Sequence, residues 1–165
     1  MFSLTDAAKL NTDALLLIFR NRFNLYGLKA IDIQAVCPVS EIIFVPQAPP
    51  FIVGAVTYRG LFFTVVDFDA LILDRTASVR SENKVVLLAS ESAKLAIRVE
   101  DIVSLTAIEE QGHRVSSQGG GKLSQFVSSA LEWKSQMVPI LDTDRLINHT
   151  LETFYRFIPG AREVR

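Results

Sequence analysis

The apolar residues of this chain gather in short runs separated by polar or turn-forming residues. Such runs stand at 14–19, 28–33, 52–58, 61–67, 85–89 and 94–99. Apolar runs of about four to eight residues, rich in Val, Ile and Phe and bounded by turn signals, are typical of buried strands. The pattern therefore predicts a mainly β fold.

Part of this pattern occurs twice. The stretch that begins at Phe51 returns 75 residues later at Phe126 without a gap, and each copy indicates a hairpin followed by a turn of helix. A weaker repeat matches 29–36 with 95–102 at an offset of 66 residues. Six positions of the first repeat are identical, namely Phe51/Phe126, Ala55/Ala130, Asp67/Asp142, Asp69/Asp144, Leu71/Leu146 and Ile72/Ile147.

The repeat predicts two pseudo-repeated five-stranded SH3-like barrels with short helices and a C-terminal helix, because short strands with regular turns close into small barrels. The polar, unpatterned stretch 74–83 marks the boundary between the halves. Apolar residues at helical spacing in 150–158 predict the final helix. We expect a single domain over 1–165, with a first barrel at 14–73, a linker at 74–83, a second barrel at 84–148, and a C-terminal helix and tail at 149–165.

Composition narrows the possible partners and compartment. The net charge is −1, so bulk electrostatics favours neither nucleic acid nor an anionic membrane surface. No apolar run approaches the roughly 20 residues of a membrane span, and the first residues do not form a signal peptide. The single cysteine, Cys37, excludes an intrachain disulfide and fits a reducing compartment. We expect a cytoplasmic protein without membrane insertion.

No catalytic, cofactor or metal site emerges from the polar residues. His113 and His149 lack a spaced cysteine, histidine or carboxylate with which a zinc site is built, and Cys37 has no histidine partner. Asp67 and its repeat Asp142 are placed to cap the following helical turn. We predict a protein that is not an enzyme. A small hydrolase or ligand-binding barrel using His113, with Ser116 and Asp67, remains the alternative from another class.

The turn at Arg59-Gly60 has two interpretations. In the first, glycine supplies the backbone freedom that a tight hairpin needs, and the arginine stands in water. In the second, Arg59 lies on an exposed rim and binds a protein partner, because arginine is enriched at binding hot spots.

Three segments carry a resemblance to the CheW-like chemotaxis coupling proteins, over about residues 14–148. They are Pro49-Pro-Phe-Ile-Val-Gly54, Tyr58-Arg59-Gly60 and Thr64-Val-Val-Asp67-Phe68. The resemblance implies twin five-stranded barrels and an adaptor without catalysis. Such adaptors link the cytoplasmic tip of a chemoreceptor to a CheA-type histidine kinase.

The resemblance also implies where partners bind, at a barrel edge for the kinase and at an apolar groove between the barrels for the receptor. Arg59 and Gly60, preceded by Tyr58, match the family's Arg-Gly turn, and Val36, Ile102 and Leu105 match groove positions. Pro38 replaces a glutamate that in the family pairs with the arginine. A CheW-like scaffold in a pilus or surface-motility signalling system is therefore a second hypothesis.

Overall fold

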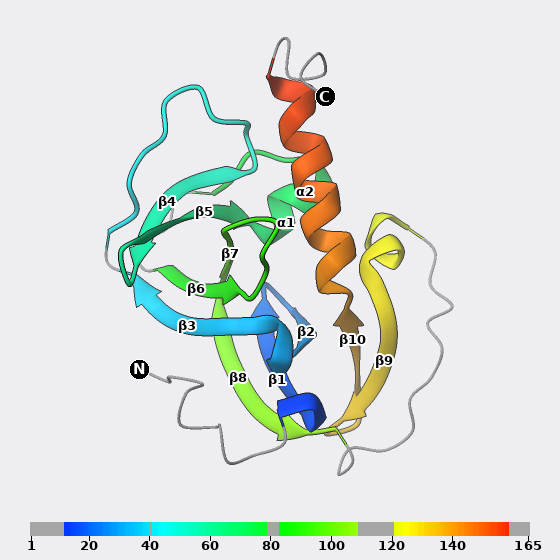
Figure 1. Cartoon of the computed structure of the whole chain (residues 1–165). Helices are drawn as coiled ribbons and strands as arrows, with labels where there is room; N and C mark the ends of the chain where they lie inside the picture. The colour runs from blue at the N-terminus through cyan, green and yellow to red at the C-terminus, as the bar shows by residue number, and fades with distance from the viewer. Residues whose placement is uncertain (1–11, 40, 79–82, 109–120, 159–165) are drawn as a thin grey trace.

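The computed structural model describes residues 12–39, 41–78, 83–108 and 121–158 (Figure 1). These residues form ten strands and two α-helices, together with short 3-10 turns that include η3 (Ala30–Asp32). The strands are β1 (Leu15–Asn21), β2 (Asn24–Lys29), β3 (Ile33–Val39), β4 (Ile52–Tyr58), β5 (Leu61–Asp67), β6 (Asn83–Leu88), β7 (Leu95–Val99), β8 (Asp101–Ala107), β9 (Val127–Trp133) and β10 (Gln136–Leu141). The helices are α1 (Phe68–Leu73) and α2 (Thr143–Phe157).

The strands form two five-stranded sheets. Sheet A has the order β8-β1-β2-β10-β9, and sheet B has the order β3-β6-β7-β5-β4. Neighbouring strands are antiparallel except for β2 with β10 and β5 with β7. The expected mainly β class with two five-stranded units is confirmed. Figure 1 shows sheet B in the upper left, sheet A below it, and α2 rising along one side.

The sheets do not follow the expected boundaries at 14–73 and 84–148. Sheet A combines β1 and β2 with three strands of the second half, and sheet B combines β6 and β7 with three strands of the first half. The expected division into barrels is therefore wrong, because the chain crosses between the sheets within each half. It crosses at η3 and again at Glu100, the one residue between β7 and β8. The run predicted as one strand at 28–33 is in fact β2, η3 and the start of β3.

The strand registers also correct the weaker repeat. Ile140 of β10 lies opposite Gly27 of β2. Its repeat equivalent, Val65 of β5, lies opposite Ala96 of β7. Gly27 and Ala96 are therefore equivalent, and the offset in this region is 69 residues rather than 66. Hydrogen bonding fixes this register, whereas short apolar runs match one another at several offsets.

Apolar side chains pack in three clusters. Two of them each belong to one sheet. The cluster of sheet A includes Leu16 and Ile18, and the cluster of sheet B includes Val85 and Leu87. The largest cluster joins the two sheets and includes Leu17 of β1. Strand β1 is thus buried on both faces, which explains why its sequence is continuously apolar instead of alternating.

Helix α2 begins earlier than the expected C-terminal helix at 149. Asp142 caps it by accepting a hydrogen bond from the Arg145 backbone N–H at 3.0 Å, so the helical turn of the repeat and the C-terminal helix are one continuous element. Residues 159–165 of the expected tail lie outside the described residues. In the expected linker, 79–82 are likewise outside, and Asn83 already belongs to β6.

Candidate protein interface

A groove of about 380 Å³ lies between β3 and β8, which are edge strands of different sheets. Three of the site residues taken from the resemblance line this groove, although Val36 lies far in sequence from Ile102 and Leu105. Sequence reasoning missed its remaining lining residues, which are Leu17, Cys37, Pro38, Lys84, Asp101, Val103 and Ser104.

The groove is the open end of the apolar cluster between the sheets. Val36, Ile102 and Leu105 are half-buried and pack against that cluster, and buried Leu17 lies beneath them. Their remaining apolar surface stays in contact with water. Removing such surface from water is favourable by about 25 cal/mol per Å², before the entropic cost of association is subtracted. The groove is therefore suited to an apolar segment of a partner.

An ion pair lies across the groove. The Lys84 ammonium on β6 of sheet B donates to the Asp101 carboxylate on β8 of sheet A. The Ile102 backbone N–H also donates to Asp101, at 3.0 Å. The hydrogen bond from Lys84 is the main reason why the pKa of Asp101 lies below its ordinary value. The groove therefore joins an apolar floor to a charged pair.

The cysteine of the groove is not activated. Cys37 is half-buried, and burial raises the pKa of its thiol. A protonated thiol is a weak nucleophile, so the groove has the character of a docking surface rather than that of a cysteine-based active site.

Tyr58, Arg59 and Gly60 do not line the groove and form the tip of the β4–β5 hairpin. Arg59 and Gly60 have φ values of 48° and 77°, as a tight hairpin turn requires. The Arg59 guanidinium lies over the Tyr58 ring, 5.3 Å from its centroid, and Arg59 is exposed. Among the described residues, Arg59 has no acidic partner within ion-pair distance. In particular, Arg59 forms no ion pair with Asp32 or Glu41, the acidic residues nearest to Pro38 in the sequence.

The second copy of the hairpin repeats this tip. Lys134 and Ser135 have φ values of 47° and 62°, and the Lys134 ammonium lies 4.6 Å from the centroid of the Trp133 ring. The two tips thus share an aromatic residue with a cation stacked on it. The turn geometry belongs to the repeat and does not by itself mark a binding residue.

An exposed apolar patch lies beside the first tip. Ile43 bridges to Ala55 on the open edge of β4 through two backbone hydrogen bonds of 2.8 and 2.9 Å. Phe62 lies opposite Thr57 and is 65% exposed. Residues opposite each other in antiparallel strands share a face, and alternate residues of one strand do too. Ile43 and Phe62 therefore lie on one face of sheet B, called here the outer patch.

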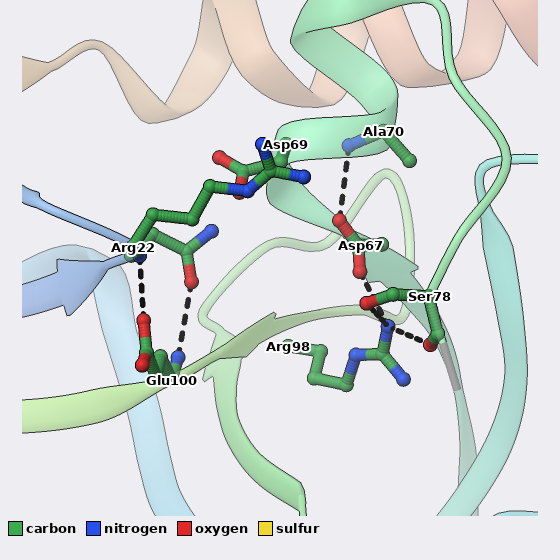
Figure 2. Close-up of polar contacts among 8 residues, drawn as sticks. Arg22, Asp67, Asp69, Ala70, Ser78, Arg98 and Glu100 are labelled. Carbon is green, nitrogen blue, oxygen red and sulfur yellow. Dashed lines mark hydrogen bonds and ion pairs between the residues drawn. The ribbon is translucent and has the colours of Figure 1, made fainter. Parts of the chain in front are cut away.

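A buried ion pair holds the base of the same hairpin. Arg98 of β7 donates to Asp67 at the end of β5 and to the Ser78 carbonyl (Figure 2). Asp67 also accepts a hydrogen bond of 2.9 Å from the Ala70 backbone N–H and so caps α1. Capping by Asp67 was expected, but its pairing with Arg98 was not. The sequence signal for this pair was the single arginine within the otherwise apolar run Leu95–Val99.

A second polar group joins the two sheets near the groove. Figure 2 shows Arg22, in the β1–β2 turn, with its backbone N–H donating to the Glu100 carboxylate at 2.6 Å. The Arg22 side chain pairs with Asp69 of α1 at 3.1 Å. Asn21 accepts a hydrogen bond of 3.0 Å from the Glu100 backbone N–H. These contacts fix the chain where it crosses from β7 to β8. Strand β8 is one wall of the groove.

Metal-binding clusters are absent from the described part of the chain: no three His, Cys, Asp or Glu side chains lie close enough together to hold an ion. His149 packs its ring against Phe126 at 4.9 Å, and its pKa is lowered mainly by burial. His113 and Ser116, on which the hydrolase alternative depends, lie outside the described residues. None of the helices in 12–39, 41–78, 83–108 and 121–158 has the length and apolar character to span a membrane.

Comparison with known proteins places the chain in a family. Residues 15–151 match the CheW-like domain. Among solved structures, scaffolding protein TtCheW from Thermoanaerobacter tengcongensis is similar, with a TM-score of 0.66 and 19% sequence identity. The similar region covers 79% of this chain and 84% of that one. No curated protein sequence matches the chain. At this identity the likeness to the solved structure shows the fold.

Proposed function

Since the chain belongs to the CheW-like domain family, we propose that it is a non-catalytic adaptor in chemosensory signalling. It couples the cytoplasmic tip of a chemoreceptor to a CheA-type histidine kinase and acts in the cytoplasm. One observation carries the proposal. Val36, Ile102 and Leu105, transferred from the family by sequence resemblance alone, line one groove between the sheets.

The groove receives the receptor tip in this proposal. Its walls come from different sheets, so an occupant contacts both halves of the molecule at once. Half-buried Val36 and Leu105 offer apolar surface that a partner can cover. A substitution that places a charge in the groove, such as Val36→Asp, leaves that charge desolvated in the complex and opposes binding.

The kinase binds at the edge of sheet B in this proposal. Strand β4 is the edge strand, the outer patch offers Ile43 and Phe62, and Arg59 extends from the neighbouring tip. Exposed apolar surface beside a free arginine is a common composition for the centre of an interface. Because Pro38 cannot accept the charge of Arg59, that charge is available to an acidic group of the kinase.

The replacement of the family glutamate by Pro38 favours a specialised pathway within this role. An adaptor of a pilus or surface-motility signalling system would use the same two surfaces with other receptor and kinase sequences. The identity of the co-purifying receptor and kinase separates the two pathways.

Binding measurements with the purified protein, a receptor-tip fragment and the kinase test the proposal. We expect Val36→Asp to abolish receptor binding, and Arg59→Ala to weaken kinase binding by about tenfold or more with a thermal midpoint close to wild type. Lys134→Ala, at the equivalent second tip, is the matched control and should leave kinase affinity unchanged. Loss of thermal stability in Arg59→Ala with unaltered kinase affinity would show a structural role instead. If the wild type failed to bind the receptor tip or failed to bind the kinase, the adaptor role would be rejected.

A further inference from the structure

The two charged residues of the groove, Lys84 and Asp101, differ in the number of interactions that compensate their charges. Asp101 accepts from Lys84 and from the Ile102 backbone N–H, and it lies opposite Arg20 in the register of β8 with β1. Arg20 contributes to the lowered pKa of Asp101, as expected of a nearby positive charge. Asp101 therefore keeps compensating contacts if Lys84 moves away.

Lys84 depends more heavily on this one pair. Its ammonium carries three N–H donors, and among the described residues it donates to the Asp101 carboxylate. The side chains of Lys84 and Asp101 are 41% and 42% exposed, so water reaches both. An exposed pair of this kind contributes little to stability and exchanges partners readily. A long lysine side chain can turn toward a new acceptor without a change in the backbone.

We propose that Lys84 recognises an acidic group of the segment that occupies the groove. The occupant is then a peptide segment of a protein partner that combines apolar side chains, for the floor around Val36 and Leu105, with a carboxylate near the Lys84 end. A basic segment is disfavoured, because it would meet the Lys84 ammonium and an Asp101 carboxylate that is already neutralised. This inference rests on the proposed function in taking the groove as the partner site, and it adds the chemistry of the partner.

Three small probes of one shape test the charge preference directly. They are 2-naphthoate, the neutral 2-naphthamide and the cationic 2-naphthylmethylammonium. Amide NMR shifts of Val36, Ile102 and Leu105 report binding in the groove itself. We expect naphthoate to bind about fivefold more tightly than naphthamide, the size of one exposed ion pair, and the ammonium probe to bind most weakly.

Two substitutions assign the preference to this pair. In Lys84→Met, naphthoate should bind no more tightly than naphthamide, because methionine keeps the apolar stem, removes the positive charge and leaves the Asp101 carboxylate, which repels an anion. In Asp101→Asn, naphthoate should bind about threefold more tightly than in wild type, because Lys84 is released. Lys94→Met is the matched control, since Lys94 lies near the Phe63 ring and outside the groove lining. This control should leave all three affinities unchanged.

Several results would overturn the inference. They are equal wild-type affinity for naphthoate and naphthamide, a preference that survives Lys84→Met, tighter binding of the ammonium probe, or groove amides that respond to none of the probes. Urea unfolding of each variant confirms that it is folded before titration. The probes need no receptor or kinase, so a preference for naphthoate without receptor-tip binding would reject the adaptor role and leave the charge preference standing.

Discussion

At the scale of single residues, Arg98 and Asp67 differ most from their surroundings. Both side chains are almost completely buried, and each neutralises the other inside the molecule. Removing one member of a buried ion pair leaves an uncompensated charge, which typically costs about 3–5 kcal/mol of unfolding free energy. The repeat offers a comparison for this effect, because Asp142 caps α2 in the same way as Asp67 caps α1.

We predict that Asp67→Asn lowers the free energy of unfolding by about 3 kcal/mol or more, since asparagine still caps a helix but no longer neutralises Arg98. Asp142→Asn should cost less than about 1 kcal/mol, because the ion pair of Asp142 with Arg145 lies at a more exposed site. Urea denaturation at neutral pH measures both. Similar losses in the two variants would show that the buried charge pair is not the main contribution of Asp67.

His149 gives the fold a dependence on pH. Burial lowers its pKa, with Asp74 and Glu152 acting in the opposite direction and Arg156 reinforcing it. The unfolded chain therefore binds a proton more readily than the folded protein. The stability contributed by neutral His149 is present above its ordinary pKa of about 6.5 and is lost as the pH falls from there through the lower folded pKa.

We accordingly predict that the urea midpoint of the wild type falls between pH 8 and pH 5.5 by more than that of His149→Gln, which cannot titrate. The difference between the two proteins should develop below about pH 6.5. Parallel midpoints over the whole range would mean that His149 titrates equally in the folded and unfolded chains. A midpoint difference that grows as the pH rises would contradict the direction of the shift.

At the scale of elements, the repeated hairpin shows how turn chemistry differs between two copies of one geometry. Both tips place two consecutive residues at positive φ, but Gly60 in the first copy corresponds to Ser135 in the second. Glycine adopts this conformation freely, whereas a residue with a Cβ atom does so at a cost of about 1 kcal/mol. No atom outside the turn lies within 4 Å of a Cβ added at Gly60, so the effect there is one of backbone conformation alone.

We predict opposite effects of exchanging these turn residues. Gly60→Ala should lower the free energy of unfolding by about 1 kcal/mol, and Ser135→Gly should raise it by up to about 1 kcal/mol. Differential scanning calorimetry of the two variants measures the sign of each change. A destabilised Ser135→Gly would show that the Ser135 side chain makes a contribution that outweighs its backbone strain.

The hairpins could be predicted from the sequence because their signals are local. The two copies begin at Phe51 and Phe126, and the turns at Arg59 and Lys134 separate their apolar runs. Asp67 and Asp142 then cap the helices that follow. The break between β2 and β3 could not be predicted in the same way. Its residues, Ala30-Ile31-Asp32, include no glycine or proline, and the runs on both sides are apolar. Only the pairing of β3 with β6 in another sheet makes the break necessary.

The groove was predictable in part for a related reason. Val36, Ile102 and Leu105 were found through the family's pattern, which carries information about the fold that composition and periodicity lack. Lys84 and Asp101 were not found, because neither stands in a motif. Their contact exists only because β6 and β8, in different sheets, come close at the open end of the shared core. Such a pair depends on the arrangement of the whole molecule.

At the scale of the whole molecule, the exchange of strands makes the two halves interdependent. Among the described strands, β3 of sheet B pairs with β6, which lies in the second half of the chain. Likewise, β8 of sheet A pairs with β1, which lies in the first half. Both walls of the groove, β3 and β8, thus pair with a strand of the other half. The groove therefore forms when the halves are assembled.

We therefore predict that the fragments 1–80 and 81–165 do not fold separately but form the native structure when mixed. Each fragment alone has an edge strand without its hydrogen-bonding neighbour, and it exposes its share of the apolar cluster between the sheets. Neither should show a cooperative urea transition. An equimolar mixture should recover one, together with the NMR shifts of Val36 and Leu105 seen in the intact chain.

The intact protein cleaved after residue 80 is the matched control. A fragment that unfolds cooperatively by itself would contradict the prediction. If 1–80 did so as a dimer, β1 of one copy would be taking the place of its repeat equivalent β6 beside β3 of the other.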